Sequence, residues 1–413
     1  MMIIDLLMTI GTFGKLIKNS KRHVKNPIVL ILGIRPDVIR ASIIIKKLKK
    51  QLGNQFVFVW SGQHYSKNMK DIFFKELKIN KPDFELNASG KTDTEFVSNL
   101  FIKLEKFLLE TKPSLTIYLG DTNTVLGSLV SAQLNIPIFH IEGGMRSFDW
   151  RMPEEKNRKV IDHLSDRIYC YLNEYKLIAL REGIPEKNLI VTGNIIVDVL
   201  DKYFFSEKLK IPSKKELQFL KNYEVNKENY FVFTCHRREN ISTKAILKNI
   251  LGMISKAENR VIFIAGYFTQ HFLNKFSLHL PSNVTLLSPV GYFDFLNLVN
   301  LSCGIISDSG TVIEEASILG KPSIQVRKST ERPQVYDVKS SVKFDPTVSS
   351  NHLEIWNNFN KLRGTTWQHP FGDGFASKRI VEDILQANSK NDFAGHDFQK
   401  YLPQSRRAYF NDL

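Results

Sequence analysis

Cysteines, acidic residues and long apolar runs are scarce in this chain of 413 residues. Its three cysteines, Cys170, Cys235 and Cys303, lie far apart and form no C-x-x-C pair, which argues against a zinc site and against a disulfide framework. We therefore expect a reducing compartment, the cytoplasm. No apolar stretch is long enough to span a bilayer, so no membrane span is expected. The sequence also lacks a Walker loop and any metal-ligand spacing, and we predict neither a metal nor a cofactor.

Acidic residues number 42 against 57 lysines and arginines, for a net charge of +15. Residues 1–50 hold eleven of the basic residues and two acidic ones, so the rest of the chain carries only a small excess. It has no basic stripe interleaved with aromatic residues of the kind that binds a polynucleotide, and no nucleic-acid partner is expected. A small anionic ligand fits this charge distribution better.

Residues 1–26 form an extension before the first predicted strand. Asp5 interrupts its apolar part and no basic region precedes that part, which argues against a signal peptide. We expect an extra helix docked on the body of the protein or on another subunit. The alternative is a short amphipathic helix on an anionic membrane surface.

From Pro27 onward, short apolar, β-branched runs alternate with segments of helical period, such as Thr94–Leu109. This alternation predicts an α/β fold with two doubly wound, Rossmann-like domains that face a cleft. The predicted strands are Ile28–Leu32, Phe56–Trp60, Leu115–Leu119, Ile136–Ile141, Ile168–Tyr171, Tyr230–Thr234, Val261–Ala265, Val284–Leu287, Gly304–Ser307 and Ser323–Val326. The predicted divisions are an extension (1–26), an N-terminal domain (27–200), a linker (201–229), a C-terminal domain (230–388) and a tail (389–413).

Polar motifs follow the predicted strands, where open α/β sheets bind ligands. Arg35 follows the first strand and is a candidate for binding a diphosphate. Asp121 follows the third strand, where a role as a helix cap is an equal alternative. The next strand ends in Glu142, and Arg146 and Glu154 lie in the turn-rich segment after it. Carboxylates that converge on one cleft can divide proton abstraction and donation between them.

The second half repeats this arrangement. His236 follows a strand and stands beside two arginines, which favours contact with a ligand over a place in the core. Ser309 and Gly310 form a small turn before a helix, a geometry that cradles phosphate. Glu315 lies one turn into that helix and is a candidate for accepting both ribose hydroxyls. Arg332 brings a further cation.

In this order, the motifs resemble the non-hydrolysing UDP-N-acetylglucosamine 2-epimerase family, whose two-domain fold is similar to the GT-B glycosyltransferases. The resemblance extends from Ile28 to Ile384. It rests on the segments GDTNT, HIEGGMRSFDWRMPEEKNR, HRREN, DSGTVIEEA and TERPQ.

The resemblance implies interconversion of UDP-GlcNAc and UDP-ManNAc by anti elimination of UDP to 2-acetamidoglucal, followed by re-addition, for surface polysaccharide precursors of bacterial type. It implies acid/base roles for Asp121, Glu142 and Glu154. His236, grouped with these catalytic residues, and Arg35 would contact the diphosphate or the sugar. The UDP portion would be held by Ser309, Gly310, Glu315 and Arg332, and Arg146 is a further candidate for substrate binding. A homodimer is implied as well.

Three alternatives remain at this stage. Thr311 stands where the family often has a second glycine, which is similar to the branch that acts on other UDP-2-acetamido sugars, such as the one forming UDP-N-acetyl-L-fucosamine. A hydrolysing enzyme that releases free ManNAc is the second, and a catalytically inactive UDP-sugar-binding protein is the third. Residues 63–69 resemble a region that binds an activating UDP-GlcNAc in some members, but their spacing differs.

Overall fold

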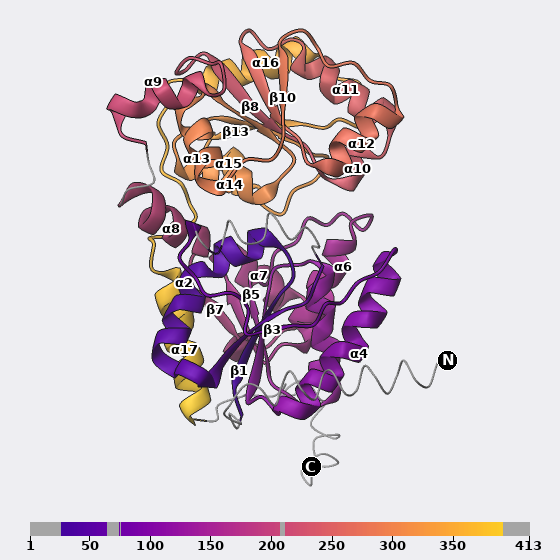
Figure 1. Cartoon of the computed structure of the whole chain (residues 1–413), viewed down its shortest axis with the longest axis vertical. Helices are drawn as coiled ribbons and strands as arrows, with labels where there is room; N and C mark the ends of the chain where they lie inside the picture. The colour runs from indigo at the N-terminus through magenta and orange to yellow at the C-terminus, as the bar shows by residue number, and fades with distance from the viewer. Residues whose placement is uncertain (1–25, 64–73, 75, 207–210, 391–413) are drawn as a thin grey trace.

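The computed structural model describes residues 26–63, 74, 76–206 and 211–390. They form two α/β units, one above the other in Figure 1. The predicted extension lies outside the described residues except for Asn26, and so do most of the tail and of residues 63–69, which resemble an activator-binding region.

The N-terminal unit is built on a parallel sheet with the strand order β3-β2-β1-β4-β5-β6-β7. Side chains of β1 alternate between two apolar layers: Leu30 packs in the same cluster as Ile44 of α2, and Ile31 in the same cluster as Leu104 of α4. Helices therefore cover both faces of the sheet. The strands are β1 (Ile28–Leu32), β2 (Phe56–Trp60), β3 (Phe84–Glu85), β4 (Leu115–Leu119), β5 (Ile138–Ile141), β6 (Arg167–Cys170) and β7 (Leu189–Val191). The helices are α2 (Arg35–Leu52), α4 (Asp93–Thr111), α5 (Ser128–Gln133), α6 (Pro153–Leu164), α7 (Asn173–Arg181) and α8 (Ile195–Leu200).

The C-terminal unit has a second parallel sheet, with the order β10-β9-β8-β11-β12-β13. In both sheets the strand order reverses once, between β1 and β4 and between β8 and β11. Ligands of open α/β sheets bind at such switch points. The strands are β8 (Tyr230–Thr234), β9 (Arg260–Ile264), β10 (Val284–Leu287), β11 (Gly304–Ser307), β12 (Ser323–Val326) and β13 (Ser341–Phe344). The helices are α10 (Arg238–Ile241), α11 (Lys244–Ile254), α12 (Tyr267–Lys275), α13 (Tyr292–Leu301), α14 (Gly310–Ile318), α15 (Gln334–Asp337) and α16 (His352–Leu362).

The predicted α/β class and the ten predicted strands are confirmed, with shifts of one or two residues at three of them. The helix predicted at 94–109 is α4. Three short strands, β3, β7 and β13, were not predicted.

The final helix, α17 (Ala376–Lys390), packs on the N-terminal unit, against α2 and α8 (Figure 1). The predicted boundaries had placed most of this helix in the C-terminal domain. Asp198 of α8 accepts hydrogen bonds from the first backbone N–H groups of α17, 2.7 Å from Ser377 N. Asp383 accepts from the Tyr169 hydroxyl at 2.7 Å and pairs with Arg167 at 3.0 Å. The chain therefore returns to the first sheet after completing the second.

The predicted linker is also partly structured. Leu220 of α9 (Ser213–Lys221) packs in one apolar cluster with Tyr230 and Leu298, so this helix belongs to the C-terminal unit. None of the helices in the described ranges combines the length and the apolar character needed to cross a membrane.

The position of α17 leads to a test by hydrogen exchange. Ile384 is fully buried in the cluster that contains α2 and α8. Replacing Ile384 by Ala should cost about 2–4 kcal/mol of local stability, because the cavity removes apolar contacts. Exchange of backbone amides, followed by mass spectrometry, should accelerate in α2 and α8.

The control is Glu382→Ala on the exposed face of the same helix. If exchange accelerates instead in the β8–β13 sheet, α17 belongs to the C-terminal unit and the packing described here is wrong.

Candidate functional site

Two loops of the N-terminal unit meet at its switch point. Gly33 follows β1, and a Cβ atom there would collide with Thr124 Oγ1 and Ser61 Oγ, so the loops after β1 and β4 approach closely. Gly120 follows β4 with φ at 79°, which favours glycine. Its carbonyl oxygen lies 2.8 Å from Nε2 of His140, a buried ring that also contacts Asp162 at 2.7 Å. These contacts fix the backbone that presents Asp121.

Asp121 lies partly buried beside Arg158 of α6, with which it forms an ion pair. Burial alone would raise the pKa of Asp121, but the positive charges of Arg158, Arg40 and Arg237 together outweigh burial, and the pKa falls below its usual value. Asp121 is therefore ionised near neutral pH. Arg158 also pairs with Glu155 at 2.9 Å.

Glu154 begins α6 and is partly buried in the same region. Its pKa is raised, first by burial and then by the negative charge of Asp121. Two carboxyl groups of one site thus have pKa values shifted in opposite directions, which is the arrangement expected of an acid/base pair.

Glu142 directly follows β5 and has a strained conformation, with φ at 78°. Its side chain is 6% exposed and pairs with arginines of both units. Glu142 Oε1 lies 2.8 Å from Arg332 of the C-terminal unit, and Oε2 pairs with Arg40 of α2. Glu142 therefore lies directly at the boundary between the units.

The switch point of the C-terminal unit is organised by Asp308, which follows β11 and is fully buried. It accepts the backbone N–H groups of His236 and Arg237 at 3.0 and 2.9 Å. Burial would raise the pKa of Asp308, but the charge of His236 and the N–H of Arg237 lower it. The His236 ring lies 3.4 Å from Asp308 and its side chain is 58% exposed, so it is available to a ligand.

Ser309 and Gly310 lead into α14 at this switch point. The Ser309 N–H donates to Ser307 Oγ at 3.0 Å, and Ser309 itself is half-buried at the start of the helix. A Cβ atom at Gly310 would collide with the guanidinium of Arg332, so only glycine lets that group lie against the backbone. Arg332 in turn pairs with Glu314 of α14 at 2.8 Å.

Glu315 is 4% exposed and accepts a hydrogen bond from the Tyr292 hydroxyl at 2.6 Å. Burial raises the pKa of Glu315 to about 8. Glu76 of the N-terminal unit approaches the backbone of the C-terminal unit closely at Gly291. A Cβ atom added at Gly291 would lie only 2.6 Å from Glu76 Oε1. Arg35 is half-buried nearby, and burial lowers its pKa while the charge of Glu76 opposes this shift.

Arg146 is enclosed by carboxylates of its own unit. Its guanidinium is fully buried and pairs with Asp162 at 2.7 Å and with Glu182 at 2.6 Å. Its observed contacts hold the segment that follows Glu142.

Sequence reasoning missed several charged residues at this boundary. Arg40 lies inside α2, and only its spacing from Asp37 hinted at the ion pair of 2.7 Å that the two form. Burial raises the pKa of Asp37 to about 6. The arginines Arg158, Arg237 and Arg327 and the acids Glu155, Glu314 and Glu331 were also not assigned a role.

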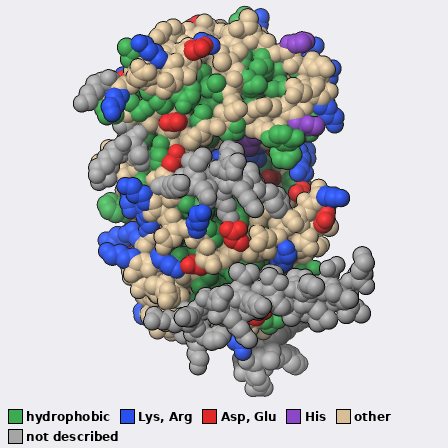
Figure 2. Space-filling model, in the orientation of Figure 1, with side chains coloured by type: hydrophobic (Ala, Val, Ile, Leu, Met, Phe, Trp, Pro, Cys, Tyr) green, Lys and Arg blue, Asp and Glu red, His purple; other side chains and the backbone are tan. Residues whose placement is uncertain are grey.

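Charged and histidine side chains gather where the two units meet, at the right of the space-filling view (Figure 2). A cavity of about 60 Å³ lies between the units, lined by Asp149 and Met152 on one side and by Asn240 and Arg327 on the other. Asp149 accepts from the Ser329 hydroxyl across it at 2.9 Å. Within the described residues, no group of three or more potential ligands is arranged to hold a metal ion.

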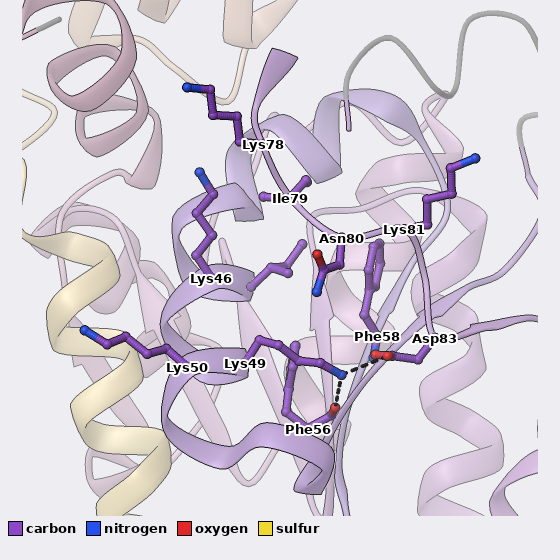
Figure 3. Close-up of a pocket in the computed structure, with 11 residues that line it drawn as sticks. Lys46, Lys49, Lys50, Phe56, Phe58, Lys78, Ile79, Asn80, Lys81 and Asp83 are labelled. Atoms are coloured by element: carbon purple, nitrogen blue, oxygen red, sulfur yellow. Dashed lines mark hydrogen bonds and ion pairs between the residues drawn. The ribbon is translucent and has the colours of Figure 1, made fainter. Parts of the chain in front are cut away.

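A larger pocket of about 240 Å³ lies on the flank of the N-terminal unit, between α2 and the segment before β3 (Figure 3). Its lysines do not converge: Lys49 bonds to Asp83 and to the Phe56 carbonyl, while Lys50 and Lys81 point away from one another. Among the described residues, the convergent charged groups therefore lie at the boundary and not in this pocket.

The raised pKa of Glu315 gives a pH test. Folded Glu315 keeps its proton up to about pH 8, whereas the unfolded chain releases it near its ordinary value of 4.5. The unfolded state then binds fewer protons, so this group makes stability fall as pH rises through that window. We expect it to contribute a loss of about 2 kcal/mol between pH 6 and 8, which Glu315→Gln removes.

The measurement is urea unfolding of the wild type and of E315Q at both pH values. Asp383→Asn serves as the control, because Asp383 lies on α17 at the far side of the first sheet. The raised pKa would be contradicted if the free energies of unfolding of wild type and E315Q differed by the same amount at pH 6 and at pH 8.

Known proteins resemble this chain both in sequence and in structure. The sequence model of the family described as UDP-N-acetylglucosamine 2-epimerase matches residues 46–385. A UDP-N-acetylglucosamine 2-epimerase of Methanococcus maripaludis is 38% identical over 369 residues, covering 86% of this chain and 97% of the relative. A UDP-2,3-diacetamido-2,3-dideoxy-D-glucuronate 2-epimerase of Pseudomonas aeruginosa is 30% identical over 368 residues, covering 87% and 99%.

A solved structure agrees with both. The crystal structure of the Methanocaldococcus jannaschii UDP-GlcNAc 2-epimerase in complex with UDP-GlcNAc and UDP superposes with a TM-score of 0.80 at 35% identity, covering 87% of this chain and 99% of that one. The predicted GT-B-like arrangement is confirmed. The chain belongs to the UDP-N-acetylglucosamine 2-epimerase family.

Proposed function

We propose that this protein interconverts UDP-GlcNAc and UDP-ManNAc at the boundary between its two units. The observation that carries the proposal is the pair Asp121 and Glu154, whose pKa values are shifted in opposite directions within one site. An ionised carboxylate and a neighbouring carboxyl group that retains its proton more readily can serve as base and acid at the same pH.

The chemistry needs such groups because the C2 hydrogen of the sugar is not beside a carbonyl. A carboxylate takes the C2 proton, the C–H electrons form the C1–C2 double bond, and the C1–O bond breaks with its electrons leaving on UDP. The product of this half-reaction is 2-acetamidoglucal. A proton delivered to the opposite face of C2, with UDP oxygen re-forming the bond to C1, gives the epimer. Asp121, Glu142 and Glu154 are the groups proposed for these transfers.

The loops of the C-terminal unit suit the leaving group. His236, Ser309 and the start of α14 at Gly310 face the boundary, where N–H groups and cations stabilise a departing diphosphate. Arg35 and Arg332 would add to that charge. Glu315 is the candidate for binding the ribose hydroxyls, because a carboxyl group that is protonated below about pH 8 offers them both a donor and an acceptor.

We also propose a biological setting for this activity, the supply of polysaccharide precursors in the cytoplasm. Nucleotide-sugar epimerisation supplies precursors for surface polysaccharides, and the three free, buried cysteines are consistent with a cytoplasmic enzyme. A homodimer remains a prediction.

The central test follows deuterium at C2. In deuterated water, purified protein should convert UDP-GlcNAc to UDP-ManNAc with loss of the C2 proton signal in the NMR spectrum. Asp121→Asn, Glu142→Gln and Glu154→Gln should each slow turnover by about 10²–10⁴-fold, because each removes a proton-transfer group.

Asp383→Asn is the matched control, since it also removes a paired carboxylate but lies on α17. Full activity in all three site variants would refute the assignment. UDP binding without exchange in the wild type would favour a binding protein, and free ManNAc as product would indicate hydrolysis.

A second candidate is epimerisation of another UDP-2-acetamido sugar. Two observations favour it: the relative that acts on a diacetamido glucuronate, and Thr311, which is half-buried directly after Gly310. We expect kcat/KM to be higher for UDP-GlcNAc than for UDP-2,3-diacetamido-2,3-dideoxy-D-glucuronate. The reverse ranking in parallel assays would transfer the proposal to the second substrate.

A further inference from the structure

Glu331 lies at the centre of the charged boundary and is 1% exposed. We call it, together with Arg158, Arg237, Arg327 and Arg332, the Glu331 cluster. Arg327 lies 2.9 Å from Glu331 Oε2, and Arg332 pairs with Oε1. Arg158 and Arg237 lie 3.5 and 3.8 Å from Oε1. One carboxylate thus serves four guanidinium groups.

The cluster joins the two units. Arg158 comes from α6 of the N-terminal unit, whereas the other three arginines follow strands of the C-terminal unit. The Glu331 carbonyl also accepts the Tyr175 hydroxyl of the N-terminal unit at 3.1 Å. Separation of the units would therefore remove Arg158 from Glu331.

The arginines depend on Glu331 to different degrees. Arg158 has two further carboxylates, Asp121 and Glu155, and Arg332 has Glu142 and Glu314. In the described part of the chain, Arg327 lies within ion-pair distance of no carboxylate except Glu331. Its buried Nη1 makes no hydrogen bond of good geometry, and the same holds for Nε of Arg332. Charge, more than directed bonding, therefore holds Arg327 to Glu331.

We propose that Glu331 is a positioning residue: its carboxylate fixes the arginine array and acts as the internal counter-charge of the site before a diphosphate binds. The proposal rests on the proposed function for its turnover consequence. Through Arg158 it also sets the place of Asp121, so that the approach of the C-terminal unit completes the arrangement around the acid/base group.

This role predicts opposite effects on binding and turnover. Glu331→Gln keeps the size of the side chain but removes the charge, leaving four cations without their shared partner. The unliganded protein then loses stability that an incoming diphosphate restores. Binding of UDP should become tighter, whereas kcat should fall because Arg158 and Asp121 are no longer held. If Glu331 had only a structural role, its substitution would weaken UDP binding and lower kcat as well.

The experiment compares wild type, E331Q, E331D and the control D383N as full chains. Calorimetric titration with UDP, and separately with inorganic pyrophosphate, gives affinities, and C2 exchange in UDP-GlcNAc gives kcat and KM. We expect E331Q to bind UDP about 3–10-fold more tightly, as loss of an opposing charge at short range implies. Its kcat should fall by about 10²-fold, as expected for misplaced reacting groups.

Glu331→Asp keeps the charge but shortens its reach, so UDP affinity should return to within about twofold of the wild type while kcat stays reduced. D383N should match the wild type in UDP affinity and in kcat. If E331Q fails to fold, E331D decides: an unchanged kcat overturns the proposal. Weaker UDP binding by E331Q, or an unchanged kcat, also overturns it.

The two proposals fail separately. If the wild type binds UDP without exchanging the C2 hydrogen, the proposed function is lost, and the UDP and pyrophosphate affinities of E331Q still decide the role of Glu331. If the wild type binds neither anion, both proposals are overturned.

Discussion

Pairing of buried charge across the boundary is the constraint on which the rest of the site depends. Arg332 is 4% exposed and lies among Glu142, Glu314 and Glu331, so carboxylates of both units share one guanidinium. Removing one partner of such a buried pair typically costs about 3–5 kcal/mol, because the other charge stays desolvated. The same buried ion pairs therefore hold the two units together and fix the positions of the acid/base groups.

The boundary is apolar where the chain crosses between the units. Tyr292 and Phe293 of α13 and Ile313 of α14 share a core cluster with Val197 of α8. The segment that returns from the upper unit to α17 runs along the side of the molecule on which α8 lies (Figure 1). An apolar contact tolerates small rotations better than a network of directed ion pairs does. The boundary thus combines an apolar contact near these helices with the ion pairs around Arg332.

Much of the fold was predictable because buried parallel strands are continuous apolar runs, and Ile28–Leu32 is one. β3, with two residues, and β13, with Lys343 in it, lack that signal. The amphipathic pattern of α17 predicts that one face is buried, but not against which sheet. Asp121, Glu142 and His236 were predictable because strand ends mark switch points.

The roles of Arg40 and Glu331 could not be predicted in the same way. Both depend on partners more than 100 positions away in the sequence: Arg40 on Glu142 across the first sheet, and Glu331 on Arg158 across the boundary. The contacts of Arg146 were not predictable either. Its place in a crowded polar segment favoured a substrate contact, but Asp162 and Glu182 enclose it.

Glu142 has a strained backbone conformation that is connected with its place in the site. A non-glycine residue at φ of 78° costs of the order of 1 kcal/mol, which glycine would avoid. The next residue cannot take over the side chain, because a Cβ atom at Gly143 would collide with Ile168 and crowd Asp162 at 2.7 Å. The N–H groups of both residues point to the Tyr169 carbonyl, at 3.1 and 3.2 Å, which fixes the turn. With the backbone so constrained, Glu142 directs its carboxylate at Arg40 and Arg332 together. The strain is retained because the pairing of the two units requires that carboxylate.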